Sequence, residues 1–100
     1  MSLTKKANPP RQFDYTKQFL KDWKRLEHSG KFNLQRLKET MLLLIANNGP
    51  LPAEYLDHPL QGPWINHRDC HVGGDFLLIY RVTEEEVIFV RAGTHADLFE

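Results

Sequence analysis

Four of the five histidines in this 100-residue chain lie in its C-terminal half. They are His58, His67, His71 and His95. Two carboxylates accompany the third of them, Asp69 before it and Asp75 shortly after it. The imidazole of histidine has an ordinary pKa of about 6.5, so it can give or take a proton near neutral pH. This combination of residue types is typical of a site for acid–base chemistry.

The stretch DCHVGGDFLLIYRV, residues 69–82, predicts how some of these side chains are placed. Successive side chains of a strand point to opposite faces of the sheet. In a strand expected to begin at Trp64, Asp69 and His71 therefore share one face, and Cys70 lies on the other. The Gly73-Gly74 pair predicts a tight hairpin turn, which leaves Asp75 close to His71.

The end of the last expected strand, in the stretch RAGTHADLF, carries Arg91 and His95. Antiparallel pairing of residues 87–93 with residues 76–82 brings this end close to Asp75. His58 lies in the long loop PLPAEYLDHPLQGPW, which can fold over the same face. Long loops without their own periodicity are often functional in small domains.

A zinc site is the alternative explanation for a cluster of His58, His71, His95 and Cys70. No CxxC or HxxxH spacing supports it. The alternation that pairs Asp69 with His71 also turns Cys70 away from them. We therefore expect neither a metal nor a cofactor.

Composition excludes several classes of protein. The single cysteine permits no internal disulfide and suits a reducing compartment. No apolar run reaches the ~18 residues of a membrane span, and the N-terminus lacks a signal-peptide core. The formal net charge is zero, although the first 40 residues are basic and the rest acidic. A solvated lysine-rich helix face explains that asymmetry as well as a binding surface does. We expect a cytoplasmic protein without a membrane partner.

Residues 1–9 are expected to form a flexible tail, and residues 10–100 a single domain. A short strand is predicted over RQFDY, residues 11–15. Thr16 is a good N-cap for a helix whose apolar residues recur at helical spacing and which Gly30 closes. A second helix is predicted to begin after Asn33 and to end at NNGP.

Three strands are expected after the long loop, separated by the Gly-Gly turn and by an acidic turn at TEEE, residues 83–86. The continuous apolar run in residues 76–80 predicts burial on both faces of the sheet. The order of elements predicts an α+β fold in which a two-helix hairpin packs on a curved, mostly antiparallel four-stranded sheet. One face of the sheet then has no helix to cover it, and polar residues of several strands can gather there.

Three separated motifs resemble the YafQ-like branch of the RelE/ParE toxin superfamily, whose members are toxins of type II toxin–antitoxin modules. They are DHPLQGPW, RDCHVGGDFLLIYRV and RAGTHADLF, and they cover residues 57–99 in order. The resemblance implies the fold described above and a metal-independent endoribonuclease that cleaves mRNA in the ribosomal A site. It also implies a cognate antitoxin of the DinJ/RelB-like, DNA-binding kind.

The resemblance also implies the residues of the site. The catalytic candidates are His58, His71, Asp75, Arg91 and His95. Asp69 and Phe99 are carried over as substrate-binding residues, Phe99 as a platform on which a base stacks or as core packing of the C-terminus.

RNA cleavage without a metal requires these types of side chain. The ribose 2′-OH attacks the adjacent phosphate while a base removes its proton and an acid protonates the departing 5′-oxygen. We expect His95 to be the acid, and His71 or His58, assisted by Asp75, to be the base. Arginine binds phosphate through a planar fork, so Arg91 is expected to hold the phosphate. Pairing of Arg91 with Glu85 or Glu86 across the hairpin is the alternative.

Two other functions remain open on the sequence alone. A ParE-like toxin that binds and poisons DNA gyrase has the same fold, so fold does not distinguish it. A binder needs no set of acid–base residues, however, and the histidines therefore favour the nuclease. An inactive member retained as an antitoxin-binding protein is disfavoured for the same reason.

Overall fold

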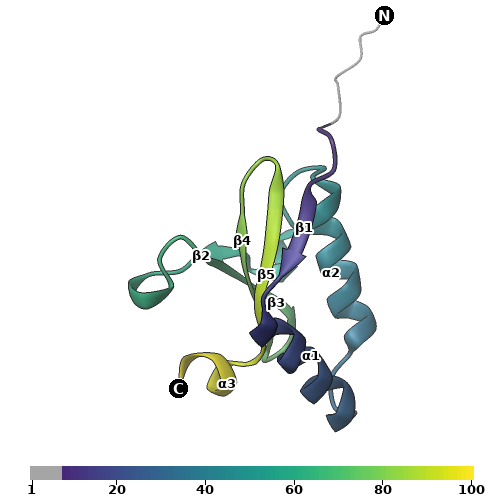
Figure 1. The fold of residues 1–100 in the computed structure, drawn as a ribbon, viewed down its shortest axis with the longest axis vertical. Coiled ribbons are helices and arrows are strands. Elements are labelled where there is room, and N and C mark those ends of the chain that lie inside the picture. Colours follow the sequence, from purple (N-terminus) through teal and green to yellow (C-terminus); the bar gives the residue numbers. More distant parts are fainter. Residues whose placement is uncertain (1–7) are drawn as a thin grey trace, which may run out of the picture.

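The computed structural model describes residues 8–100 and places two helices on one side of a five-stranded sheet (Figure 1). All but the last two residues of the predicted tail, residues 1–9, lie outside the described part. In chain order the elements are β1 (Gln12–Tyr15), α1 (Lys17–Ser29), α2 (Leu34–Ala46), η1 (Ala53–Tyr55), β2 (His58–Pro59), η2 (Gly62–Trp64), β3 (Arg68–Gly73), β4 (Phe76–Val82), β5 (Glu86–Thr94) and α3 (His95–Phe99).

The sheet has the strand order β1-β5-β4-β3-β2. β1 runs parallel to β5, and the other neighbours are antiparallel. This confirms the predicted α+β fold with its two-helix hairpin. The fifth strand is β2, whose two residues pair with β3 so that His58 lies opposite Asp69. A strand this short in a proline-rich loop has no periodicity from which it can be predicted.

The two helices begin and end where their capping residues predict. The Thr16 side chain accepts a hydrogen bond from the amide of Phe19, and that of Asn33 accepts one from the amide of Arg36. Gly30 closes α1 with φ of 68°, a left-handed conformation that glycine adopts without steric cost. Leu42 and Leu43 of α2 are 62% and 43% exposed, outside the apolar stripe that packs on the sheet.

β4 is buried on both faces, as its apolar run predicts. Leu78 and Tyr80 belong to the core that lies between the sheet and the helices. Leu77 and Ile79 belong to a second, smaller cluster on the opposite face, with Leu98 of α3. Figure 1 shows α3 and the loop that carries β2 on the side of the sheet away from α1 and α2.

Two predicted boundaries in the β3–β4 hairpin are wrong by a few residues. The strand expected from Trp64 begins at Arg68, because Gly62–Trp64 form a 3₁₀ turn. The tight turn lies at Gly74-Asp75, since Gly73 still pairs with Phe76 after a register shift in β3. Gly74 alone of the two glycines has a positive φ, 54°. Within residues 8–100, none of the helices has the length and apolar character that a membrane crossing requires.

The two glycines of this turn are therefore expected to differ in their tolerance of a side chain. Gly74→Ala should lower the free energy of unfolding by ~1 kcal/mol, because an L-residue is strained in the left-handed region. Gly73→Ala is the matched control: its new Cβ atom would lie 3.8 Å from Arg36, an ordinary contact, and should leave stability unchanged or slightly raised. Urea unfolding of both variants measures the difference. If both variants lose the same free energy of unfolding, or if Gly73→Ala loses more, the turn does not lie at Gly74-Asp75.

Candidate active site

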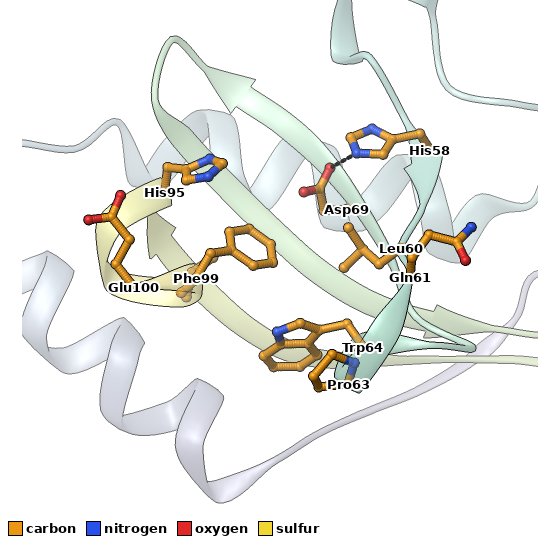
Figure 2. A pocket seen from close by; sticks show the side chains of 10 residues that line it. His58, Leu60, Gln61, Pro63, Trp64, Asp69, His95, Phe99 and Glu100 are labelled. Carbon is orange, nitrogen blue, oxygen red and sulfur yellow. Dashed lines mark ion pairs between the residues drawn. The ribbon is translucent and has the colours of Figure 1, made fainter.

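A cleft of about 680 Å³ opens on the face of the sheet opposite the helices. One wall is the loop from His58 to Trp64, and the other is α3 with the C-terminus. Figure 2 shows side chains from both walls facing each other across the cleft. The lining residues are His58, Leu60, Gln61, Pro63, Trp64, Asp69, His95, Leu98, Phe99 and Glu100.

Asp69 lies at the base of the cleft with only 4% of its surface exposed. Its Oδ1 atom is 3.2 Å from Nε2 of His58, yet it receives no hydrogen bond from any residue that the structure describes. Burial raises the pKa of Asp69, and the positive forms of His58, His71 and His95 oppose that shift. A buried acceptor without a donor is rare in proteins. The protonated form of His58 forms an ion pair with this oxygen.

His58 has its tautomer fixed by the backbone. Its Nδ1 atom lies 2.8 Å from the carbonyl oxygen of Leu56. A carbonyl oxygen can only accept, so Nδ1 carries a proton. Nε2 is then the atom that can take up a further proton, and it faces Asp69. A carboxylate beside that nitrogen stabilises the imidazolium once the proton has been taken up.

The residue before His58 anchors this loop to the sheet. The carboxylate of Asp57 accepts hydrogen bonds from the hydroxyl of Tyr80 and from the guanidinium of Arg68, the latter at 3.1 Å. Tyr80 is buried in the core and Arg68 begins β3. Asp57 therefore holds the loop against β3 and β4, and this contact positions the neighbouring His58 beside Asp69. Sequence reasoning assigned Asp57 no role, although it is the first residue of the DHPLQGPW motif.

His95 is the first residue of α3, and several contacts fix that helix. The Thr94 side chain accepts from the amide of Asp97, and the Asp97 carboxylate accepts from the amide of Thr94. This reciprocal capping box determines where the helix begins. Asp75, in the β3–β4 turn, accepts a hydrogen bond of 3.0 Å from the amide of His95. The predicted closeness of Asp75 and His95 is confirmed, but the carboxylate binds the backbone of His95.

His71 lies two residues beyond Asp69 on the same face of β3. Its Nδ1 atom is 3.2 Å from the carbonyl oxygen of Gly74, which again leaves Nε2 as the free basic atom. His71 does not line the cleft. The positive form of His71 favours the ionised form of Asp69 and so opposes the rise of the Asp69 pKa.

Arg91 forms an ion pair with Asp22 of α1. Its Nε and Nη2 atoms donate to the two carboxylate oxygens at 2.9 and 3.0 Å. Burial raises the pKa of Asp22. The hydrogen bonds from Arg91 and from the Ala92 amide lower it by more, so that the pKa lies below its ordinary value. The alternative of pairing with Glu85 or Glu86 is wrong. Two of the three guanidinium nitrogens are thus engaged, and Arg91 does not line the cleft.

Two aromatic residues also line the cleft, the predicted Phe99 and Trp64, which was not predicted. Phe99 packs against His95 with ring centroids 5.0 Å apart, and against Trp64 at 6.3 Å. Trp64 was expected on the strand face opposite Asp69, so sequence reasoning missed it. The 3₁₀ turn breaks the alternation on which that expectation depended. Cys70 is fully buried in the core on the helix side, on the opposite face of β3 from His71, as predicted.

Comparisons with known proteins agree with this arrangement. The family described as bacterial toxin of type II toxin–antitoxin system, YafQ, matches residues 11–100. The mRNA interferase toxin YafQ of Escherichia coli (strain K12) is 48% identical over 89 residues, which are 89% of this chain and 96% of the relative.

Solved structures give the same result. The crystal structure of YafQ from E. coli strain BL21(DE3) superimposes with a TM-score of 0.85 at 47% identity, covering 90% of this chain and 99% of that one. YafQ in the E. coli DinJ–YafQ toxin–antitoxin complex gives a TM-score of 0.84 at 47% identity, covering 91% and 99%. The likeness therefore includes the sequence over nearly the whole chain as well as the fold.

The raised pKa of Asp69 predicts how stability depends on pH. The folded state holds the Asp69 proton more tightly than the unfolded chain, whose aspartate pKa is about 3.9. Stability contributed by this group is therefore full below that value and is lost as pH rises through the raised pKa. Asp69→Asn should remove this loss and make the protein more stable than wild type at pH 7. Thermal unfolding of both proteins between pH 4 and 8 measures it.

The control variant is Asp14→Asn, since Asp14 lies on β1 with all four strand residues exposed. Its unfolding curve should follow that of wild type across this pH range. An Asp69→Asn protein less stable than wild type at pH 7 would mean that the contact with His58 outweighs the cost of burying the carboxylate.

Proposed function

This chain belongs to the YafQ family of bacterial toxins of type II toxin–antitoxin systems, and we propose that it stops translation by cutting mRNA in the ribosomal A site. As a member of that family it is an mRNA interferase, an endoribonuclease. The observation that carries the mechanism is the facing of His58 and His95 across a cleft whose base is the buried Asp69, with Oδ1 of Asp69 3.2 Å from Nε2 of His58.

In the proposed reaction the 2′-OH of one nucleotide donates its hydrogen bond to Nε2 of His58, and the carboxylate of Asp69, 3.2 Å from that nitrogen, stabilises the imidazolium that forms. Nε2 of His58 takes the proton as the 2′-oxygen attacks phosphorus. His95, on the opposite wall, gives a proton to the 5′-oxygen as the bond from phosphorus to that oxygen breaks. The products are a 2′,3′-cyclic phosphate and a 5′-hydroxyl. His58 is preferred to His71 as the base because His58 lines the cleft.

The remaining predicted residues take supporting roles in this scheme. The positive form of His71 stabilises negative charge that develops near Asp69. Asp75 positions His95 through its amide. Arg91 can reach a phosphate only with Nη1, since its other two nitrogens bind Asp22. Phe99 lines the substrate cleft.

The ribosome is proposed as the source of the substrate because of the charge of the toxin. Binding to free RNA depends on cationic side chains that displace counterions from phosphates. The formal net charge here is zero, so affinity for free RNA is expected to be weak. A ribosome that already holds the mRNA removes the need for such affinity.

The antitoxin is the second partner, as DinJ is of YafQ. We propose that it also binds operator DNA and that an acidic or amphipathic segment of it lies along α1. The lysines Lys17, Lys21 and Lys24 are exposed on that helix. Arg25 lies on the same helix but already pairs with Asp22 and Asp97.

Expression in bacteria tests the activity. Induction of the toxin alone should stop growth, and co-expression of the antitoxin encoded beside it should restore growth. Primer extension on cellular mRNA should show cuts in the reading frame. Arrest without such cuts, accompanied by inhibited gyrase, would favour the ParE-like alternative. Harmless expression in several bacterial hosts would contradict both.

Substitution of the two cleft histidines tests the mechanism. His58→Ala and His95→Ala should each slow cleavage by ~10²-fold or more, because each removes one proton transfer. Both should still bind the antitoxin. The control is His28→Ala, at an exposed position on α1, which should cleave at the wild-type rate. RNA products with a 5′-phosphate would exclude attack by the 2′-OH, and a fully active His95→Ala would remove that residue from the mechanism.

A further inference from the structure

The aromatic end of the cleft has no role in the proton transfers, although it is part of the same cavity. Trp64 lies on the loop wall and Phe99 on the α3 wall, and both are partly exposed. Leu60 and Leu98 complete an apolar lining at this end. Figure 2 shows the two rings beside one another, below His95 and Asp69 in that view.

The indole of Trp64 is held in place by ring contacts that are nearly perpendicular. The Phe99 ring is inclined at 76° to it and the His67 ring at 84°, with the His67 centroid 5.2 Å away. Nδ1 of His67 lies 3.1 Å from the carbonyl oxygen of Ile65, which holds that ring as well. Among residues 8–100 no ring is stacked parallel on the indole. It is thus oriented but still able to accept a flat partner.

The two ends of the cleft differ in the chemistry they can bind. One end has two imidazoles and a buried carboxylate, whose Oδ1 atom lies 3.2 Å from Nε2 of His58. The other end is aromatic and apolar. A nucleotide has the same division, with an anionic phosphate and a ribose hydroxyl at one end and a flat ring at the other. The volume of about 680 Å³ lies within the ~300–1,000 Å³ range of small-ligand pockets.

From this arrangement, and resting on the nuclease function proposed above, we infer that Trp64 is a nucleobase platform. The base that stacks on it belongs to the nucleotide that supplies the attacking 2′-OH, on the 5′ side of the cut. That ribose must lie beside His58 and Asp69 for its hydroxyl to reach Nε2 of His58, and the aromatic wall is the part of the same cleft left for its base. Trp64 is then a substrate-binding residue that determines where the chain is cut relative to a base.

Stacking recognises the presence of a ring more than its identity, because every base has a π-face. Trp64 is therefore expected to require a base at this nucleotide without strongly selecting which one. Gln61 and Glu100 also line the cleft, and their polar side chains are the groups available to select one base over another by hydrogen bonding.

The test combines a change in the protein with a change in the RNA. Ribosomes are programmed with an mRNA that carries either a normal nucleotide or a single abasic ribonucleotide on the 5′ side of the cleavage site. Single-turnover cleavage by wild type should be slower by ~10-fold or more on the abasic RNA, the typical loss for one stacked base. Trp64→Leu should show a similar loss on normal RNA and no further loss on abasic RNA. Trp64→Phe should stay within about threefold of wild type, because it keeps a ring.

Ile65→Ala is the matched control, since Ile65 is the next residue, 61% exposed, and outside the cleft. It should cleave both RNAs as wild type does. If Trp64→Leu cleaves the abasic RNA more slowly than it cleaves normal RNA, so that the two losses multiply, the stacking role of Trp64 is wrong. It is also wrong if neither the substitution nor the missing base slows cleavage. If Trp64→Leu does not fold, the abasic RNA with wild-type protein still tests the subsite. A wild-type protein that cuts neither RNA would instead contradict the nuclease function.

Discussion

The structure depends on one strand that must be covered on both faces. In β4 the five residues from Phe76 to Tyr80 are all buried. A single layer of two helices can cover only one face of a sheet, and α1 and α2 cover the face of Leu78 and Tyr80. The opposite face, with Leu77 and Ile79, needs another cover. The long loop and α3 provide it, and they bring His58, Trp64, His95 and Phe99 with them. The site is therefore a product of the burial that β4 requires.

A small number of polar contacts hold the long loop and α3 on this face of the sheet. Asp57 ties the loop to Tyr80 and Arg68, and the capping box of Thr94 and Asp97 fixes the start of α3. Asp22 adds a third contact, because it pairs with Arg91 and accepts from the amide of Ala92, both in the strand that leads into α3. Such contacts matter most where apolar burial is small. The cluster behind the cleft has three buried members, so packing alone orients the two walls only weakly.

Burial of the Asp69 carboxylate lowers the stability of the fold, and the same residue lies in the proposed active site. A carboxylate buried at this position loses hydration, and Oδ1 gains no hydrogen bond from residues 8–100 in return. Three nearby imidazoles offset part of that cost when they are protonated. Local unfavourable features of this kind concentrate at functional sites. The same oxygen that lowers stability lies 3.2 Å from Nε2 of His58, where it stabilises the imidazolium form of that ring.

The sequence by itself determined the elements and most of the chemistry. Capping at Thr16, Asn33 and Gly30 and the apolar run of β4 are local signals, so the helices and the doubly buried strand could be predicted. The alternation in β3 likewise placed Asp69 with His71 and turned Cys70 away. These inferences hold because they depend on the periodicity of one element at a time.

Only the tertiary structure decided which partners these residues meet. Asp22 and Arg91 are 69 residues apart, and nothing in either local pattern selects one for the other. Trp64 and Phe99 meet because a 3₁₀ turn and a five-residue helix cover the same face. Short, aperiodic segments carry no repeat from which the direction of a side chain can be inferred. Their positions follow from the apolar surface that the rest of the fold leaves uncovered, and that surface exists only once the sheet has formed.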